Sequence, residues 1–152
     1  MQDSALPAAK VANLVDDALT EVEVTIEVPR GGFIKRHPDG EIDFVSPVPC
    51  PFNYGSVSGS VADDGDPLDA VVLGPRLRVG QRCTVTPWAR VRFIDDGLVD
   101  DKLICGDQAP TESERRSIRW FFTCYGLAKR ALNLTRGRRG ATRFDGLVAL
   151  DQ

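Results

Sequence analysis

Apolar and polar residues alternate over much of the chain, and a helical period replaces the alternation near the end. Val22, Val24, Ile26 and Val28 are separated by polar residues, which is typical of a half-buried strand. Similar segments, bounded by glycine, proline and aspartate, follow at close spacing. The further predicted strands are 33–36 and 41–45 as a hairpin, 69–73, 82–94 with Pro87 at an edge or bulge, and 100–105. This pattern predicts a mainly β fold, a small barrel or sandwich.

Two segments have the period of a helix. Thr111 followed by Glu114 is the sequence signature of a capping box. A helix is therefore predicted from Thr111 to about Asn133, and its apolar stripe consists of Ile118, Phe121, Phe122, Tyr125 and Leu132. An alanine-rich segment, 4–19, predicts a second, short helix. With these helices beside the strands, the predicted class is α+β.

Length and composition narrow the class of protein. The 152 residues fit one domain, 1–152, with 1–20 as an N-terminal extension and 136–152 as a shortened C-terminal tail. No apolar run approaches the roughly 20 residues of a membrane span, and no secretory signal pattern begins the chain. We therefore expect a cytoplasmic protein without a membrane partner. The net charge of −3 argues against general nucleic-acid binding.

Cysteine and histidine exclude two kinds of metal site. The four cysteines are widely spaced and form no Cys-x-x-Cys pair, so a structural zinc site is not expected. His37 is the single histidine, which excludes a site that needs two histidine ligands from one chain. His37 has three interpretations: a surface turn residue before Pro38, a phosphate contact, or a transition-metal ligand.

The segment 64–69 concentrates negative charge at the start of an apolar run. Asp64, Asp66 and Asp69 lie within six residues, and like charges this close repel unless a cation lies between them. Mg²⁺ and Ca²⁺ prefer carboxylate oxygens. An EF-hand is excluded because its sixth and twelfth loop positions would be Asp69 and Pro75. Taken alone, the segment fits an exposed acidic turn better than a metal site.

A second acidic cluster strengthens the metal hypothesis. Asp95 and Asp100 stand at opposite ends of a predicted hairpin turn, and Lys102 follows closely. If the two clusters face each other, their carboxylates can hold more than one Mg²⁺, which is usually completed by water and substrate phosphates. Carboxylates with lysines nearby therefore indicate a phosphate substrate. The alternative for this cluster is an exposed acidic turn.

The ordered set of motifs resembles the soluble family I inorganic pyrophosphatases, which hydrolyse diphosphate to two phosphates with Mg²⁺. Asp64-Gly65-Asp66-Pro67-Leu68-Asp69 matches the family signature. The other matching segments, in order, are 26–29, 34–35, 53–55, 95–102 and 120–125. The resemblance covers about 22–126. It implies an OB-like five-stranded closed β-barrel with flanking helices, in a homo-oligomer that is a hexamer by resemblance.

The resemblance also implies a role for each matching residue. Asp66 would be the general base for the attacking water. The implied metal ligands are Asp64, Asp69, Asp95, Asp100 and Glu27. The implied phosphate-binding residues are Lys35, Tyr54, Lys102 and Tyr125. The implied cofactor is Mg²⁺, with Mn²⁺ or Zn²⁺ as alternatives, and the partners are diphosphate and phosphate.

The chain departs from the family pattern at three positions. His37 replaces an acid, Gly126 replaces a lysine, and an arginine expected after the 41–45 strand has no equivalent. Each lost charge-assisted hydrogen bond weakens phosphate binding by roughly 1.5–3 kcal/mol.

Three functions follow from these observations. They are an inorganic diphosphatase, a diverged relative acting on another phosphate ester, and a non-enzymatic OB-like module. The module would bind RNA through Arg136, Arg138 and Arg139, although a solvated surface loop is the favoured interpretation of that tail in an acidic chain.

Overall fold

The computed structural model describes residues 21–36, 41–45, 49–60 and 65–150 of the chain. The helix predicted over 4–19 and the residues His37 and Asp64 lie outside the described residues. Within the described part, no helix is long and apolar enough to cross a membrane.

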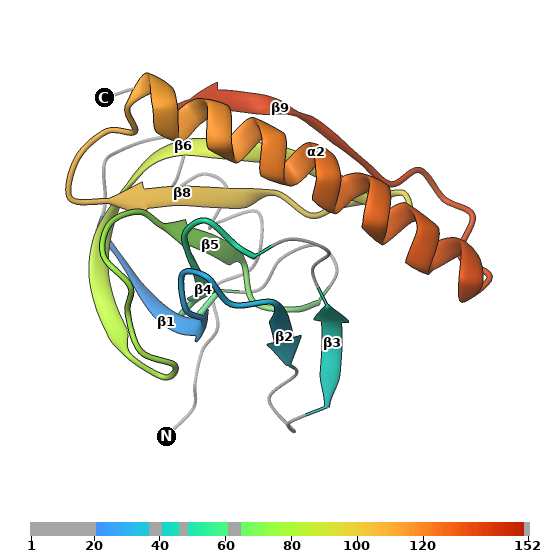
Figure 1. Ribbon diagram of the computed structural model, residues 1–152, viewed down its shortest axis with the longest axis horizontal. Helices are drawn as coiled ribbons and strands as arrows, with labels where there is room; N and C mark the ends of the chain where they lie inside the picture. Colours follow the sequence, from blue (N-terminus) through green and yellow to red (C-terminus); the bar gives the residue numbers. More distant parts are fainter. Residues whose placement is uncertain (1–20, 37–40, 46–48, 61–64, 151–152) are drawn as a thin grey trace.

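Five strands pair in a closed ring (Figure 1). They are β1 (Val22–Val28), β4 (Asn53–Val57), β5 (Asp69–Val72), β8 (Lys102–Gly106) and β6 (Arg82–Asp95). Each pairs with the next in that order, and β6 closes the ring by pairing with β1. The pair β5–β8 is parallel and the others are antiparallel. The predicted mainly β, OB-like arrangement is therefore confirmed.

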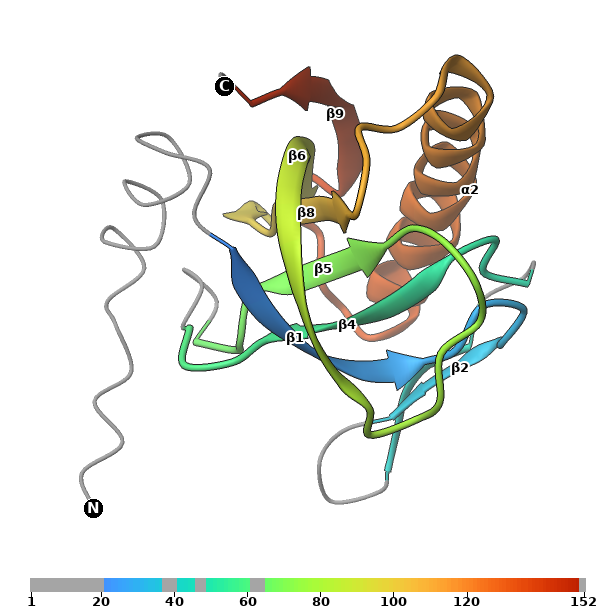
Figure 2. The ribbon, with the colours of Figure 1, turned by 90° about the vertical axis from the view of Figure 1, so that its left-hand side faces the viewer.

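Strand β6 spans much of the barrel wall because it bends. Figure 2 shows it running from β1 to β8. The register of its pairing with β8 shifts between Pro87 and Ala89, so the predicted irregularity at Pro87 is confirmed. Such an irregularity increases local twist, which lets β6 pair with β1 through its first half and with β8 through its second.

Strands β5 and β8 are buried on both faces, and this explains their unbroken apolar sequences. Ala70 and Val72 pack in the barrel interior with Leu103. Val71 and Ile104 point the other way, into a second core beneath the long helix. Successive strand side chains alternate between faces, so both faces need apolar residues.

The helix α2 (Glu112–Thr135) covers this second core. Thr111 and Glu114 form the predicted capping box, with the Thr111 amide donating to Glu114 Oε1 (3.0 Å) and the Glu114 amide to Thr111 Oγ1 (3.1 Å). The helix ends two residues beyond the predicted Asn133. Its aromatic residues form the layer between helix and barrel: Phe121 lies 5.2 Å from Phe52, ring centroid to centroid.

Three short strands lie outside the ring. The hairpin β2 (Ile34–Arg36) and β3 (Ile42–Val45) forms a separate two-stranded sheet, as predicted. The short strand β7 (Leu98–Val99) pairs with the end of β6.

The strand β9 (Arg143–Ala149) was not predicted. It pairs with β6, and the register between them shifts where Gly146 adopts a φ of +126°. This irregularity interrupts the alternation by which a strand is recognised in sequence. Phe144 and Leu147 nevertheless pack on the core beneath α2.

We expect a methyl group at Gly55 to disrupt the barrel. Gly55 pairs with Ile26, and a Cβ there would collide with the main-chain carbonyl of Thr25 and come within 3.0 Å of Val24 Cγ1. Gly55→Ala should lower the free energy of unfolding by about 3 kcal/mol, the upper range for overpacking, measured by urea denaturation. Gly106→Ala is the control, because its Cβ would lie 3.4 Å from Leu73 Cβ, and an equal loss there would contradict this explanation.

Candidate active site

The candidate site begins where β5 starts. Asp69 pairs with Lys102 in the parallel register between β5 and β8. Tyr54 of β4 pairs with Val71, two residues after Asp69, so its side chain shares the face of Asp69. The Tyr54 hydroxyl donates to Asp69 Oδ2 (2.8 Å). Strand register therefore brings these three polar side chains together.

Lys102 is the electrostatic centre of the cluster. Its side chain is fully buried, and its Nζ lies 2.9 Å from Asp69 Oδ2 and 2.9 Å from Asp100 Oδ2. A buried ammonium is tolerated only when it is paired. Burial alone would lower the pKa of Lys102, but the carboxylates of Asp69 and Asp100 raise it well above its usual value. Lys102 is therefore positively charged.

Lys35 approaches the same carboxylate from the β2–β3 hairpin. Its Nζ lies 3.2 Å from Asp69 Oδ1 and 5.2 Å from the centroid of the Tyr54 ring. Burial lowers the pKa of Lys35, but Asp69, helped by Glu27, raises it above its usual value overall. Burial by itself raises the pKa of Asp69; Lys102 and Lys35 outweigh it and hold that pKa well below 3.8. All three groups are charged at neutral pH.

Two phenols complete the cluster as neutral hydrogen-bond donors. Tyr125, on α2, packs its ring 5.3 Å from the ring of Phe93. Burial raises the pKa of Tyr125 to about 12, although Lys102 and Lys35 oppose the shift. Burial and the nearby charge of Asp69 also raise the pKa of Tyr54. Both hydroxyls stay protonated at neutral pH and can donate to a phosphate oxygen.

The structure thus brings together six of the residues predicted from the sequence. The charge of Glu27 contributes to raising the pKa of one of them, Lys35. The six are Lys35, Tyr54, Asp69, Asp100, Lys102 and Tyr125. Asp66 lies in an exposed bend just before β5. Asp95 lies instead against α2, where it accepts from Asn133 Nδ2 (2.6 Å) and lies 3.9 Å from Lys129 Nζ.

Lys129 and Asn133 are buried polar residues whose place beside the predicted acids the sequence did not reveal. They follow Tyr125 at intervals of four residues and so share its helix face. Asn133 entered the sequence argument only as the helix end. The signal in the sequence that could have revealed them is the spacing of four residues, which continues the buried face of α2 from Tyr125 to Lys129 and Asn133.

The packing of Gly126 explains one departure from the expected pattern. A Cβ at this position would lie 3.3 Å from the Phe144 amide nitrogen and 3.4 Å from Phe93 Cε2. Gly126 therefore packs directly against β9 and β6. A side chain here would need the neighbouring backbone at Phe144 to shift by a few tenths of an ångström.

The donor set fits a hard divalent cation. Within the described ranges, no three histidine, cysteine or acidic side chains converge as a metal-binding group. Asp69 and Asp100 nevertheless converge on one positive charge, the Lys102 ammonium. Carboxylate oxygens are the ligands that Mg²⁺ prefers.

Comparison with known proteins decides the family. The family model described as inorganic pyrophosphatase matches residues 24–133 of the chain. The chain belongs to the inorganic pyrophosphatase family. The resemblance stated from the sequence motifs is thereby confirmed.

Two relatives and one solved structure illustrate the family match. The chain is 33% identical to the inorganic pyrophosphatase of Gluconobacter oxydans over 59% of this chain and 56% of the relative. It is 32% identical to the inorganic pyrophosphatase of Synechocystis sp. over 69% of this chain and 63% of the relative. The chain therefore spans less than two-thirds of the length of each relative. The Thermus thermophilus inorganic pyrophosphatase superposes with a TM-score of 0.69 at 26% identity, covering 98% of this chain and 90% of that one.

The second structure, an inorganic pyrophosphatase of Neisseria gonorrhoeae, shares the fold. It has a TM-score of 0.66 at 20% identity, over 97% of this chain and 89% of that one. The ring of strands with α2 packed on it is therefore the fold of pyrophosphatases.

The pairing of Asp69 predicts how acid affects the metal-free protein. Its pKa is held below 3.8 in the folded state, so the unfolded state takes up the proton first and acid favours unfolding. This stabilisation is present above about pH 4 and is lost as the pH falls further. Asp69→Asn should flatten the decline of unfolding free energy below pH 4. Asp145→Asn, which removes an exposed ion pair with Arg143, should leave the decline unchanged; an equal flattening would contradict the role of Asp69.

Proposed function

We propose that the protein hydrolyses inorganic diphosphate to two phosphates in a Mg²⁺-dependent reaction. The observation that carries the proposal is the cluster at the start of β5, in which two lysines and two phenols surround paired carboxylates. Membership of the inorganic pyrophosphatase family supports it. Diphosphate is small and highly charged and has no apolar part. The lysines and phenols of the cluster offer it positive charge and hydrogen bonds.

We assign the cations to the acidic residues named from the sequence. Asp64, Asp69 and Asp100 would hold the first cation, with Asp69 shared with a second. Asp95 would join Asp100 around a substrate-bound cation, and Glu27 would lie at the outer site. When bound, the cation supplies a Lewis acid that lowers the pKa of the attacking water and neutralises phosphate charge. Mg²⁺ is the proposed ion, with Mn²⁺ or Zn²⁺ as alternatives.

The remaining residues would act on the water and the phosphates. Asp66 would accept a proton from the attacking water as it adds to one phosphorus atom, and the bridging P–O bond breaks. Lys35 and Lys102 would stabilise the charge that develops on the leaving phosphate. Tyr54 and Tyr125 would donate hydrogen bonds to phosphate oxygens. Both products leave as inorganic phosphate.

Phosphate release from diphosphate by the purified full chain tests the proposal. We expect release with Mg²⁺ and none after chelation by EDTA, with recovery when Mg²⁺ is restored. If Mg²⁺, Mn²⁺ and Zn²⁺ all fail to support release, the proposed reaction is wrong.

A diverged phosphate-ester hydrolase is the second candidate, favoured by the close packing of Gly126. Without a lysine there, the pocket around the leaving group has less positive charge. Nucleotides and sugar phosphates should be assayed beside diphosphate, and activity confined to diphosphate would exclude this candidate.

We further propose a single cytoplasmic domain that assembles as a homo-oligomer, a hexamer by resemblance. The proposal includes no membrane or nucleic-acid partner.

A further inference from the structure

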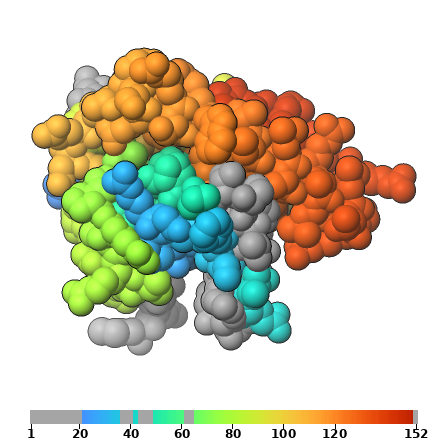
Figure 3. Space-filling view, viewed as in Figure 1, coloured from blue at the N-terminus to red at the C-terminus, as the bar shows by residue number. Residues whose placement is uncertain are grey.

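The C-terminal half of α2 contacts the end of β6 that carries Asp95. In Figure 3 the C-terminal part of the helix extends beyond the barrel. Lys129 and Asn133 follow Tyr125 by four and eight residues and are buried on the same helix face. Phe93 and Asp95 are two residues apart on β6, so their side chains share a face. Because the Phe93 ring packs 5.3 Å from the Tyr125 ring, Asp95 meets the next turns of the helix.

Asn133 holds one oxygen of the Asp95 carboxylate. Its Nδ2 donates to Asp95 Oδ1 at 2.6 Å and to Thr142 Oγ1 at 3.0 Å. Asn133 is 1% exposed, so packing fixes the position of this amide. Lys129 Nζ lies 3.9 Å from the other oxygen, Asp95 Oδ2, which is beyond hydrogen-bond distance. The carboxylate is therefore held through Oδ1, while Oδ2 faces the charge of Lys129.

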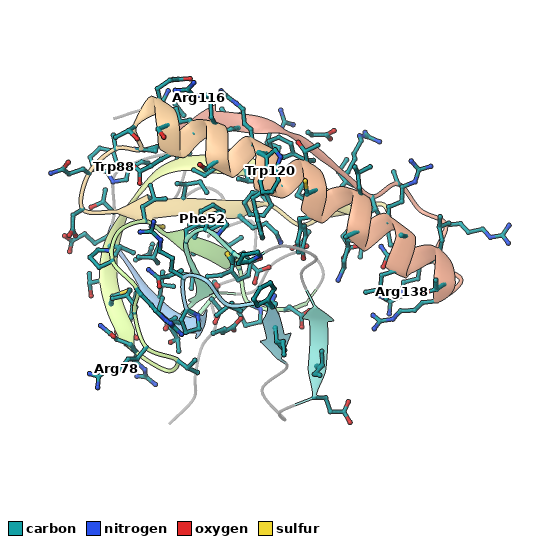
Figure 4. All side chains as sticks on the ribbon, viewed as in Figure 1. Phe52, Arg78, Trp88, Arg116, Trp120 and Arg138 are labelled. Atoms are coloured by element: carbon teal, nitrogen blue, oxygen red, sulfur yellow. The ribbon has the colours of Figure 1, made fainter. Side chains whose placement is uncertain are left out.

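The loop after α2 holds the same turn. Figure 4 places Arg138, in this loop, at the far end of the helix. The Arg138 amide donates to the main-chain carbonyl of Asn133 (2.8 Å). The Asp96 amide donates to Thr142 Oγ1 (3.0 Å), and the Gly140 amide donates to Asp96 Oδ1 (2.8 Å). Asn133 thus joins the helix, the loop and the turn that follows Asp95.

The remaining polar atom of Asn133 argues against a role in stability alone. Asn133 Oδ1 is buried and has no hydrogen-bond partner among the described residues. An unsatisfied buried acceptor destabilises a fold, and leucine would fill similar space without one. A group of this kind needs an explanation, and the two donors that the amide directs to Asp95 and Thr142 supply it.

We propose that Asn133 is a positioning residue, which holds Asp95 through Oδ1 and leaves Oδ2 for the cation that arrives with the substrate. The inference rests on the proposed function, in which Asp95 joins Asp100 around that cation. Residues that hydrogen-bond a metal ligand orient it, and their replacement weakens metal binding by about 10–100-fold. The charge of Lys129 balances the Asp95 carboxylate until the cation binds.

Calorimetric titration of the full chain with inorganic phosphate in the presence of Mg²⁺ tests this role. Asn133→Leu retains the size of the side chain and removes both donors, so phosphate should bind about 10–100-fold more weakly. Thr135→Val is the matched control, because its lost hydrogen bond, to the Leu132 carbonyl (2.6 Å), lies at the same end of α2. It should bind phosphate as the wild type does. No binding by the wild type, unchanged binding by Asn133→Leu, or an equal loss in Thr135→Val overturns the proposal.

Kinetics distinguish positioning of Asp95 from a structural role of Asn133. A partly unfolded variant would lower kcat for diphosphate hydrolysis with the folded fraction and would leave KM unchanged. Asn133→Leu should instead raise KM and the half-saturating Mg²⁺ concentration by about 10-fold or more. A fall in kcat alone overturns the proposal.

Thr142→Val tests the same contacts if Asn133→Leu does not fold. Valine retains the shape of threonine and removes the oxygen that accepts from Asn133 Nδ2 and from the Asp96 amide. Phosphate should bind several-fold more weakly with Mg²⁺ present, and unchanged binding overturns the proposal. A wild type that hydrolyses no diphosphate would refute the proposed function, whereas the calorimetry would still decide the role of Asn133.

Discussion

Replacement of Lys102 by methionine should lower the free energy of unfolding of the metal-free protein by about 3–5 kcal/mol. The Lys102 side chain is fully buried and holds Asp69 and Asp100 through contacts of 2.9 Å each. Methionine fills similar space but leaves two carboxylates, only 12% and 13% exposed, facing each other without the shared cation. Urea denaturation at pH 7 in EDTA measures the loss.

The control is an ion pair of the same kind at the surface. Arg82 lies 4.0 Å from Glu23, and these side chains are 74% and 46% exposed. Such pairs contribute about 0–1 kcal/mol, so Arg82→Met should change stability little. If Lys102→Met costs no more than Arg82→Met, the buried lysine does not stabilise the fold as described.

Added Mg²⁺ should partly restore the Lys102→Met variant. A ligand that binds only the folded state stabilises it by mass action, and the variant has two nearby carboxylates without their lysine. Mg²⁺ should therefore raise the unfolding free energy of Lys102→Met more than that of Arg82→Met. Equal increases would contradict a cation-binding role for Asp69 and Asp100.

Replacement of Asp66 by asparagine should lower kcat for diphosphate hydrolysis by about 10²–10⁴-fold, the usual contribution of a general base. Asparagine retains the shape of the side chain but does not accept a proton from water. Because Asp66 is exposed in the bend before β5, its replacement should leave the melting temperature nearly unchanged. Phosphate release with saturating diphosphate and Mg²⁺ measures the effect.

The split between kcat and KM separates loss of a base from loss of binding. In Asp66→Asn, KM should change far less than kcat. Asp107→Asn, at an exposed position after β8, should retain the wild-type kcat and KM. Activity of Asp66→Asn within a few-fold of the wild type would rule out Asp66 as the base.

Local patterns predicted those parts of the fold that local physics determines. The alternation over β1 and the capping box of α2 depend on neighbouring residues, and both appear in the structure as predicted. The unbroken apolar residues of β5 correctly indicated burial. The two cores that cause this burial, one inside the barrel and one beneath α2, were not evident, because they depend on how distant strands pair.

Long-range pairing also explains the burial and the contacts in the candidate site that local patterns did not predict. Lys102 is a charged residue in a charged segment, a pattern that favours an exposed position, yet the parallel register with Asp69 places it in the interior. Asp95 lies against Asn133 because α2 extends far enough to reach the hairpin turn. The closeness of Gly126 to β9 depends on a strand that local alternation does not reveal.

The parallel pairing of β5 with β8 has a consequence for folding. Asp69 and Lys102 are 33 positions apart, and parallel strands cannot be joined by a tight hairpin. The chain must complete its long excursion through β6 and β7 before these side chains meet. Non-local contacts form slowly, so the proposed diphosphate hydrolysis should return during refolding only with the final closure of the barrel. An incompletely synthesised or partly opened chain would lack the candidate site altogether.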